Sequence, residues 1–239
     1  MIKALLLICC FSIEINIPEL LHGNDYSENF QVWGLEKMDA MNMAKYADTY
    51  RISIAKELFS SEIISGYMQA YLSTDHKAGP GISYNKLPKH KYQSYGMVFI
   101  IPDNRHSLEI ARSLIPYEIA RYVLFHEFGT RLPSFIKIGI CAKWENQETT
   151  NNTEKTQREW KDKGIYPDAI KVINFPFVSL ETFDEYVASK IIIKALIEKT
   201  TDENPYSRLF DLAEYDIMTQ GLEELYGLTI EDLDKILKQ

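Results

Sequence analysis

The residues of this chain with the clearest chemical potential are a carboxylate and a guanidinium one helical turn apart. Glu118 and Arg121 belong to the sequence YEIAR, which begins at Tyr117. A glutamate in a cleft can act as a general base toward water or a substrate group. Residues three apart on a helix are also neighbours, so Arg121 is placed to pair with Glu118. We expect this pair, and burial would strengthen the coupling to Arg121 and so hold Glu118 ionised.

The segment around this pair, SLIPYEIARYVLFHEFGTRLPSFIKIGICAKWE, runs from Ser113 to Glu145 and resembles the core of gluzincin metallopeptidases, the peptidase MA-like group. In that family a helix bearing HExxH is followed by a connector, a proline, an aromatic residue and a second helix. The two histidines and a glutamate of the second helix bind zinc, and the glutamate of HExxH is the general base. Pro133 and Phe135 stand at the positions of the proline and the aromatic residue.

The zinc positions of the family are all altered in this chain. Tyr117 and Arg121 stand where the family has its two histidines, Ile138 stands at the third ligand, and Glu118 keeps the position of the base. A guanidinium has no lone pair to donate and repels a divalent cation. The resemblance therefore implies a vestigial zinc site at Tyr117, Glu118, Arg121 and Ile138, with no metal and no other cofactor.

The C-terminal residues extend this resemblance. The run GLEELYGLTIEDLDKILKQ, which begins at Gly221, is similar to the closing helices of the family, where an aromatic–glycine pair ends one helix and a threonine or serine caps the last. Tyr226, Gly227 and Thr229 reproduce that order. The likeness covers residues 40–239 and implies an α+β, zincin-like fold, with a small β-sheet, two helices of the active-site type and a helical C-terminal part.

Periodic apolar residues locate the helices that would position these side chains. Helical spacing predicts one helix over 35–59 and another over 108–128, which Pro116 must kink or divide. A proline in the first turn favours a helix over 133–144. Residues 180–239 are predicted to be helical, with breaks at Asn204-Pro205 and at Gly227.

Strands and a polar segment complete the predicted layout. Apolar and β-branched runs bounded by turn residues predict strands over 67–72, 82–84 and 95–101. The charged and polar stretch 145–163 is predicted to be a loop with a short exposed helix. This order, short strands first and helices afterwards, is typical of the α+β class.

Three tyrosines near the predicted strands are candidates for a groove. Tyr84, Tyr92 and Tyr95 lie beside a lysine-containing stretch, and a sheet edge can pair with an extended peptide through its backbone. Aromatic residues at such positions are also typical of a half-buried sheet face. We therefore keep both interpretations, a peptide groove and ordinary sheet packing.

The N-terminal residues predict export. Lys3 precedes a ten-residue, predominantly apolar run, Ala4–Ile13, and Glu14 ends the run. A basic start before an apolar run of this length is typical of a signal peptide, and the run is too short for a membrane-spanning helix. We expect residues 1–20 to be a signal peptide or an anchor, with a peptidase MA-like domain over 30–239. A buried N-terminal strand is the alternative.

Composition narrows the classes of function. The chain has 239 residues, of which 46% are apolar, which is enough for one substantial domain or a small pair. The net charge of −8 argues against a nucleic-acid partner, because phosphate binding requires clustered cations. Cys141 is the single cysteine outside the apolar N-terminal run, so a processed chain has no internal disulfide framework.

These observations predict an exported, catalytically inactive relative of a metallopeptidase that binds a peptide or protein or serves as a scaffold. Contact with a membrane is expected only through an uncleaved N-terminal segment. The alternative is an active hydrolase or peptidase that uses Glu118 or metal ligands that the alignment does not identify.

Export can be tested by disrupting the apolar run. Replacing Leu6 and Leu7 by Asp should retain the protein in the cytoplasm, because charges in the apolar run prevent recognition as a signal. The same double substitution at Leu20 and Leu21, beyond the run, is the matched control. Fractionation followed by mass determination measures the outcome, and unchanged localisation of the first variant would contradict the prediction.

Overall fold

The computed structural model describes residues 24–26, 30–33, 37–60, 68–72, 81–85, 96–101, 105–129, 131–174 and 182–239. Side chains are described over 41–60, 112–113, 115–129, 131–174 and 182–239. The chain divides into two compact units. The N-terminal unit comprises Met1–Ala55 and Glu62–His126, and the C-terminal unit comprises Lys56–Ser61 and Glu127–Gln239.

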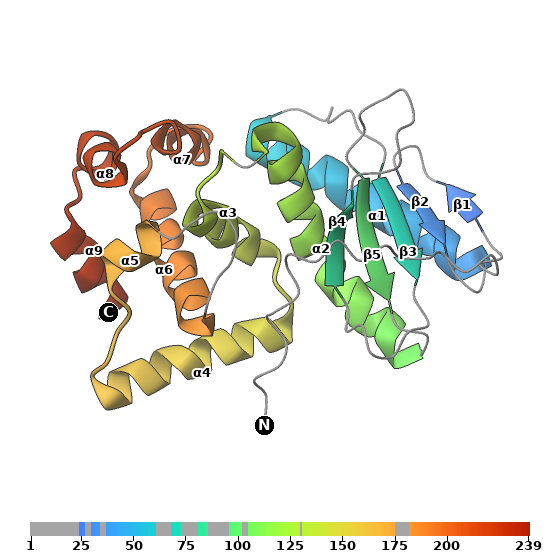
Figure 1. The fold of residues 1–239 in the computed structure, drawn as a ribbon, viewed down its shortest axis with the longest axis horizontal. Helices are drawn as coiled ribbons and strands as arrows, with labels where there is room; N and C mark the ends of the chain where they lie inside the picture. Colours follow the sequence, from blue (N-terminus) through green and yellow to red (C-terminus); the bar gives the residue numbers. More distant parts are fainter. Residues whose placement is uncertain are drawn as a thin grey trace. The chain divides into compact units, whose positions relative to one another are not determined.

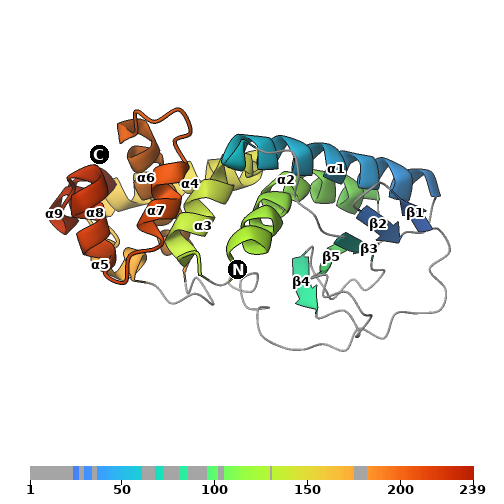
Figure 2. The same ribbon diagram turned by 90° about the horizontal axis from the view of Figure 1, so that it is seen from above.

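The N-terminal unit contains short strands and most of two long helices. Its elements are β1 (Asn24–Tyr26), β2 (Phe30–Trp33), α1 (Lys37–Phe59), β3 (Met68–Leu72), β4 (Gly81–Asn85), β5 (Gly96–Ile101) and α2 (Arg105–Phe128). The strand order is β1-β2-β3-β5-β4, in which β3 is parallel to both neighbours and the outer pairs are antiparallel. Within this unit, α1 and α2 lie on the same side of the strands (Figures 1 and 2).

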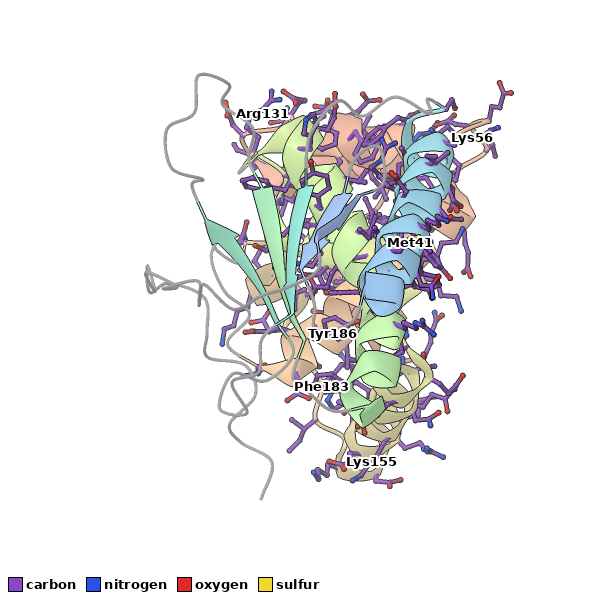
Figure 3. The ribbon with its side chains drawn as sticks, turned by 90° about the vertical axis from the view of Figure 1, so that its right-hand side faces the viewer. Met41, Lys56, Arg131, Lys155, Phe183 and Tyr186 are labelled. Carbon is purple, nitrogen blue, oxygen red and sulfur yellow. The ribbon has the colours of Figure 1, made fainter. Side chains whose placement is uncertain are left out.

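Helix α1 confirms the helix predicted over 35–59. Its buried residues recur every three or four positions and form one apolar face: Met43, Ala44, Ala47, Ile54, Ala55 and Leu58. Arg51 is also buried on this helix, and its Nε lies 3.2 Å from Oδ1 of Asp48, one turn earlier. Figure 3 shows α1 from Met41 toward Lys56, near its C-terminal end.

Helix α2 runs through Pro116 without a break. The sequence predicted a kink or a new helix there, because proline lacks an amide donor and its ring crowds the preceding turn. The structure has one helix over Arg105–Phe128 with Pro116 inside it. Ile115, Ile119 and Val123 are all buried on this helix, and their packing favours continuity across the missing hydrogen bond.

The C-terminal unit is built around α6 (Phe183–Lys199). The other elements are α3 (Ser134–Cys141), the 3-10 turn η1 (Ala142–Trp144), α4 (Gln147–Lys163), α5 (Ala169–Ile173), α7 (Ser207–Leu212), α8 (Met218–Tyr226) and α9 (Ile230–Leu237). Helix α6 packs against α3, α4, α5 and α9. Figure 3 labels Phe183 and Tyr186 on its first turn, where their rings stack with centroids 5.5 Å apart. These helices confirm the helical prediction for 133–144 and 180–239.

Gly139 allows α3 to lie close to α6. A Cβ atom at this position would lie 2.8 Å from the carbonyl oxygen of Ser189 and closer still to Cβ and Cγ1 of Ile193. No residue with a side chain fits at that separation without a shift of one helix. The backbone of α3 therefore makes direct contact with α6, and Ile136, Ile140 and their neighbours complete the core around it.

The last turn of α1 is part of the C-terminal unit. Oε1 of Glu57 accepts a hydrogen bond from the Tyr206 hydroxyl at 2.7 Å, and the Leu58 carbonyl accepts one from Nδ2 of Asn204 at 2.8 Å. The ring of Phe59 stacks on Phe210, with centroids 5.4 Å apart. Burial, followed by the bond to Glu57, raises the pKa of Tyr206. These contacts join residues 56–61 to the region around α7.

The loop predicted over 145–163 is wrong, because this stretch forms the 17-residue helix α4. Oδ1 of Asn146 caps its first turn by accepting from the Thr149 amide at 2.8 Å, and Gly164 ends it with φ 63°. Its buried residues are Thr153 and Trp160, two turns apart. Two buried positions are too few to give a periodic apolar signal, which is why the sequence suggested a loop.

The α+β, zincin-like fold expected from the sequence is also wrong. Over the residues whose side chains are described, the chain is 78% helical with no strand or sheet, so this part of the molecule is all-α. The strands, three to six residues long, are described by their backbone alone. Apolar runs over 67–101 favoured a sheet domain, whereas the polar composition of 145–163 concealed a helix.

The predicted breaks near the C-terminus are confirmed. Gly227 ends α8 with φ 62°, and Thr229 begins α9 with a capping box that includes Asp232. Hydrogen bonds from Lys235 and from the backbone and hydroxyl of Thr229 lower the pKa of Asp232 to about 2. Among the described helices, none is long and apolar enough to cross a membrane.

The close contact between α3 and α6 can be tested by adding one methyl group. Gly139→Ala should destabilise the protein by about 1 to 3 kcal/mol, because overpacking forces a backbone shift. Urea unfolding measures the difference. Adding Ile193→Ala should not restore stability, since alanine keeps the Cβ atom that is in the way. A Gly139→Ala protein as stable as the wild type would contradict this packing.

Candidate functional site

Glu118 and Arg121 form the ion pair that their spacing predicts. Nη1 of Arg121 lies 3.0 Å from Oε2 and 3.2 Å from Oε1 of Glu118. The side chains are 25% and 18% exposed for Arg121 and Glu118, respectively, so the pair is sheltered but not fully buried. Both carboxylate oxygens therefore accept hydrogen bonds from one guanidinium nitrogen, and the pair is confirmed.

The four predicted zinc-site positions fall in different units. Tyr117 is half-buried on α2 with Glu118 and Arg121, all in the N-terminal unit. Ile138 lies on α3 of the C-terminal unit, where it is 7% exposed. The expected packing of Ile138 against the ion pair stays a prediction.

The three tyrosines predicted to line a peptide groove lie mostly outside the described part of the chain. Tyr84 belongs to β4, for which the backbone alone is described, whereas Tyr92 and Tyr95 are outside the described residues. Within the described residues, no three or more His, Cys, Asp or Glu side chains are grouped so that they could hold a metal ion. Cys141 is a free thiol and is buried.

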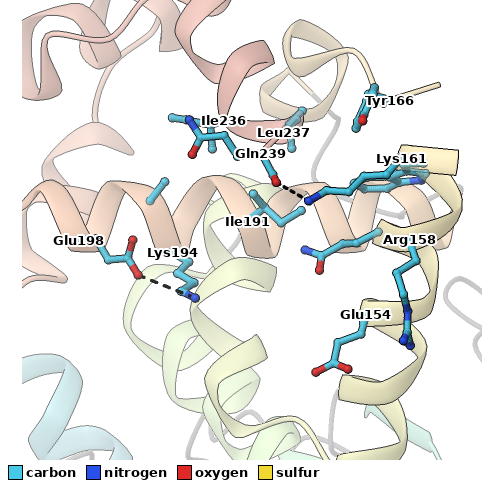
Figure 4. Close-up of a pocket in the computed structure, with 13 residues that line it drawn as sticks. Glu154, Arg158, Lys161, Tyr166, Ile191, Lys194, Glu198, Ile236, Leu237 and Gln239 are labelled. Atoms are coloured by element: carbon cyan, nitrogen blue, oxygen red, sulfur yellow. Dashed lines mark hydrogen bonds and ion pairs between the residues drawn. The ribbon is translucent and has the colours of Figure 1, made fainter. Parts of the chain in front are cut away.

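A groove that the sequence did not predict lies in the C-terminal unit. It has a volume of about 440 Å³ and is formed where α4, α6 and the end of α9 meet (Figure 4). Its lining residues are Glu154, Gln157, Arg158, Trp160, Lys161, Tyr166, Ile191, Lys194, Ala195, Glu198, Ile236, Leu237 and Gln239. This volume is within the range of ligand pockets, about 300 to 1,000 Å³.

Aromatic side chains in this groove are held in place. Nε1 of Trp160 donates a hydrogen bond to Oδ1 of Asp184 at 2.8 Å, which ties α4 to the start of α6. Trp160 is only 6% exposed. Its ring and the ring of Tyr166 pack edge to face, with centroids 6.4 Å apart. An indole fixed at both its nitrogen and its ring edge gives the groove a rigid apolar wall.

Charged side chains surround the apolar wall. Nζ of Lys161 donates to the Gln239 carbonyl, and Figure 4 shows this side chain reaching from α4 to the end of α9. Nζ of Lys194 is 3.9 Å from Oε1 of Glu198, and these side chains are 74% and 66% exposed. An exposed pair at this distance contributes little free energy, so it can exchange for another partner.

Glu145 holds α4 against α6 and thereby sets the shape of the groove. Its side chain is 4% exposed and lies in the link between η1 and α4. Its carboxylate accepts hydrogen bonds from the Tyr186 hydroxyl at 2.7 Å, from the Thr150 hydroxyl at 3.0 Å and from Nζ of Lys190. A buried carboxylate with three donors, one of them the cation Lys190, is well compensated.

Neither the groove nor Glu145 gave a clear signal in the sequence. The groove residues come from three helices that are far apart in the chain, and Glu145 resembles any other charged residue of a polar stretch. The one signal present was Trp160, a large apolar residue in a region otherwise suited to a loop.

Comparisons of the chain with protein-family models, curated proteins and solved structures found no match. The likeness to gluzincins therefore stays a prediction.

The role of Glu145 can be tested by removing its charge. Glu145→Gln should lower the free energy of unfolding by about 1 to 3 kcal/mol, because Lys190 and Tyr186 lose the anion that they share. Glu148→Gln, at an exposed position in the first turn of α4, is the matched control and should change stability little. In chemical denaturation, equal effects of the two variants would show that Glu145 is not an anchor.

Proposed function

We propose that this chain is a non-catalytic protein that binds a peptide or protein segment. The observation that carries the proposal is the state of Glu118. A general base needs a lone pair directed at the proton that it removes. Both oxygens of Glu118 instead accept from Arg121, at 3.0 and 3.2 Å.

In the described part of the chain, the side chains beside Glu118 on α2 are those of Tyr117 and Arg121, and neither is a replacement for a catalytic metal. Arg121 holds a fixed positive charge beside the carboxylate, and Tyr117 is a half-buried phenol. The alternative, a hydrolase that depends on Glu118, would use a carboxylate whose two oxygens each already accept a hydrogen bond from Arg121. We therefore favour binding over catalysis.

The groove of the C-terminal unit supports a binding role. It combines a rigid aromatic wall, aliphatic side chains from α6 and α9, and charged residues at its rim. This combination of apolar surface with a few polar groups is typical of ligand sites. The proposal also places the protein outside the cytoplasm, on the basis of residues 1–20 of the sequence.

Catalysis can be tested with a library of fluorogenic peptides, with and without added zinc. The wild-type protein should cleave none of them above the rate in buffer, because both oxygens of Glu118 accept hydrogen bonds from Arg121, and Tyr117 and Arg121 stand where the family has its two histidines. Arg121→Ala should not gain activity, although it frees the carboxylate. Glu118→Gln is the control for contamination. Cleavage by the wild type that Glu118→Gln abolishes would overturn the proposal in favour of an active hydrolase.

A further inference from the structure

We propose that α4 is a releasable strap: residues 147–168 detach and unfold as one unit while the rest of the C-terminal unit stays folded, and this release opens the groove between α4, α6 and α9. The inference goes beyond the proposed binding function, because it concerns how the groove opens and not what it binds. It is carried by the sparse burial of α4, by the firm contacts on either side of the strap and by the composition of the helix.

Helix α4 is docked through few buried side chains. Helices α4 and α6 each have 17 residues, but α6 buries seven of them and α4 buries two, Thr153 and Trp160. The Thr153 hydroxyl donates to the Thr149 carbonyl of the same helix at 3.0 Å, so this bond adds nothing to the docking. Trp160 is therefore the main apolar contact of α4. Elements with so little buried apolar surface open at a lower free energy than the core of a unit.

The docking contacts at the C-terminal end of α4 are two side-chain hydrogen bonds. Nε1 of Trp160 donates to Oδ1 of Asp184 at 2.8 Å, and Nζ of Lys161 donates to the Gln239 carbonyl in an exposed position (Figure 4). Exposed hydrogen bonds contribute little net free energy, because water replaces them. Release of this end breaks these two bonds and exposes one indole.

The chain on either side of the strap is held more firmly. Before α4, the Glu145 side chain is 4% exposed, and its carboxylate accepts from Tyr186 and Lys190 of α6. After the strap, Ala169 is fully buried at the start of α5, and its amide donates to Oδ1 of Asp234 in α9 at 3.2 Å. The segment between these two points can leave while both of its ends remain fixed.

The composition of α4 couples release to unfolding. Its first ten residues, QETTNNTEKT, include four threonines and two asparagines, which are poor helix formers. An isolated helix of such composition and of only 17 residues is marginal in water. Gly164 ends the helix in the left-handed region, with φ 63°, so the link to α5 does not extend it. Docking on α6 therefore maintains the helix, and release lets it unfold.

Release changes the groove from a bounded space to an open face. The docked groove has a volume of about 440 Å³, and α4 supplies one of its walls. Among the lining residues, Ile191 and Ala195 belong to α6, and Leu237 belongs to α9. These apolar side chains stay in place when α4 leaves, so docking of α4 controls access to them.

Hydrogen exchange of the full-length wild-type protein, resolved to single amides by mass spectrometry, tests the strap. Protection factors over residues 151–163 should be at least about a hundredfold lower than those of the buried residues of α6, and they should be nearly equal to one another because the segment opens as a unit. Equal protection of α4 and α6 would show that α4 opens only with the whole unit. Protection that rises steadily toward the middle of α4 would show fraying of its ends. Either result would overturn the proposal.

A double variant identifies the docking contacts. W160F/K161M removes both hydrogen bonds while keeping an aromatic ring and an aliphatic chain, and it should lower protection in α4 by about tenfold or more while changing that in α6 less than about twofold. Y166F/K163M makes similar changes within the strap and is the matched control, since Lys163 bonds to Glu159 of its own helix. Equal losses of protection in α4 and α6 of W160F/K161M, or equal effects of the two variants on α4, would overturn the proposal. If W160F/K161M does not fold, the wild-type exchange pattern decides by itself.

Discussion

The contact between α3 and α6 at Gly139 is the constraint on which the C-terminal unit depends. With no side chain at this position, the two helices approach until the backbone of one meets Ser189 and Ile193 of the other. Helix α6 is thereby fixed in the centre of the unit, and it carries Tyr186 and Lys190 on its first two turns. Those two residues bind Glu145, which holds α4. The groove between α4, α6 and α9 thus depends on the contact that Gly139 of α3 makes with α6.

Two carboxylates of the C-terminal unit, Glu145 and Glu57, each accept hydrogen bonds from several side chains. Glu145 accepts from three side chains, and Glu57 accepts from Tyr206 and from Lys143. In each case the carboxylate joins segments that are distant in sequence. Glu118 differs, because its partner is one turn away on the same helix. A local pair of this kind fixes one side chain and leaves the tertiary structure to apolar packing.

How far the sequence predicted the structure depended on the range of each interaction. The helix at α1 and the Glu118–Arg121 pair follow from spacing along one helix, so both could be predicted. The cap at Thr229 is also local, and it was predicted. Helix α4 was missed because it has only two buried residues, too few for a periodic apolar pattern. The features that mark it in the sequence are its caps, Asn146 and Gly164. The fold class was wrong for a different reason: apolar runs over 67–101 suggested a sheet domain, whereas the part of the chain whose side chains are described is helical, with no strand or sheet.

The groove could not be predicted for a different reason. Its lining combines residues of α4, α6 and α9, and each of these looks like an ordinary amphipathic or polar helix by itself. The sequence shows which side chains are charged, but only tertiary structure shows that Arg158 and Lys194 share a concave surface. The resemblance to metallopeptidases directed attention to Tyr117, Arg121 and Ile138, and it gave no indication of this second location.

The position of the last turn of α1 has a consequence for biosynthesis. Glu57 and Leu58 leave the ribosome long before their partners Tyr206 and Asn204, which are separated from them by 149 and 146 residues. Native docking of this turn must wait until α7 has been made. The C-terminal unit is therefore made of two separate stretches of the chain, Lys56–Ser61 and Glu127–Gln239. It cannot be completed until the second stretch has been synthesised. Contacts of such long sequence separation slow folding and leave Phe59 available to other apolar surfaces, including those of a chaperone, during translation.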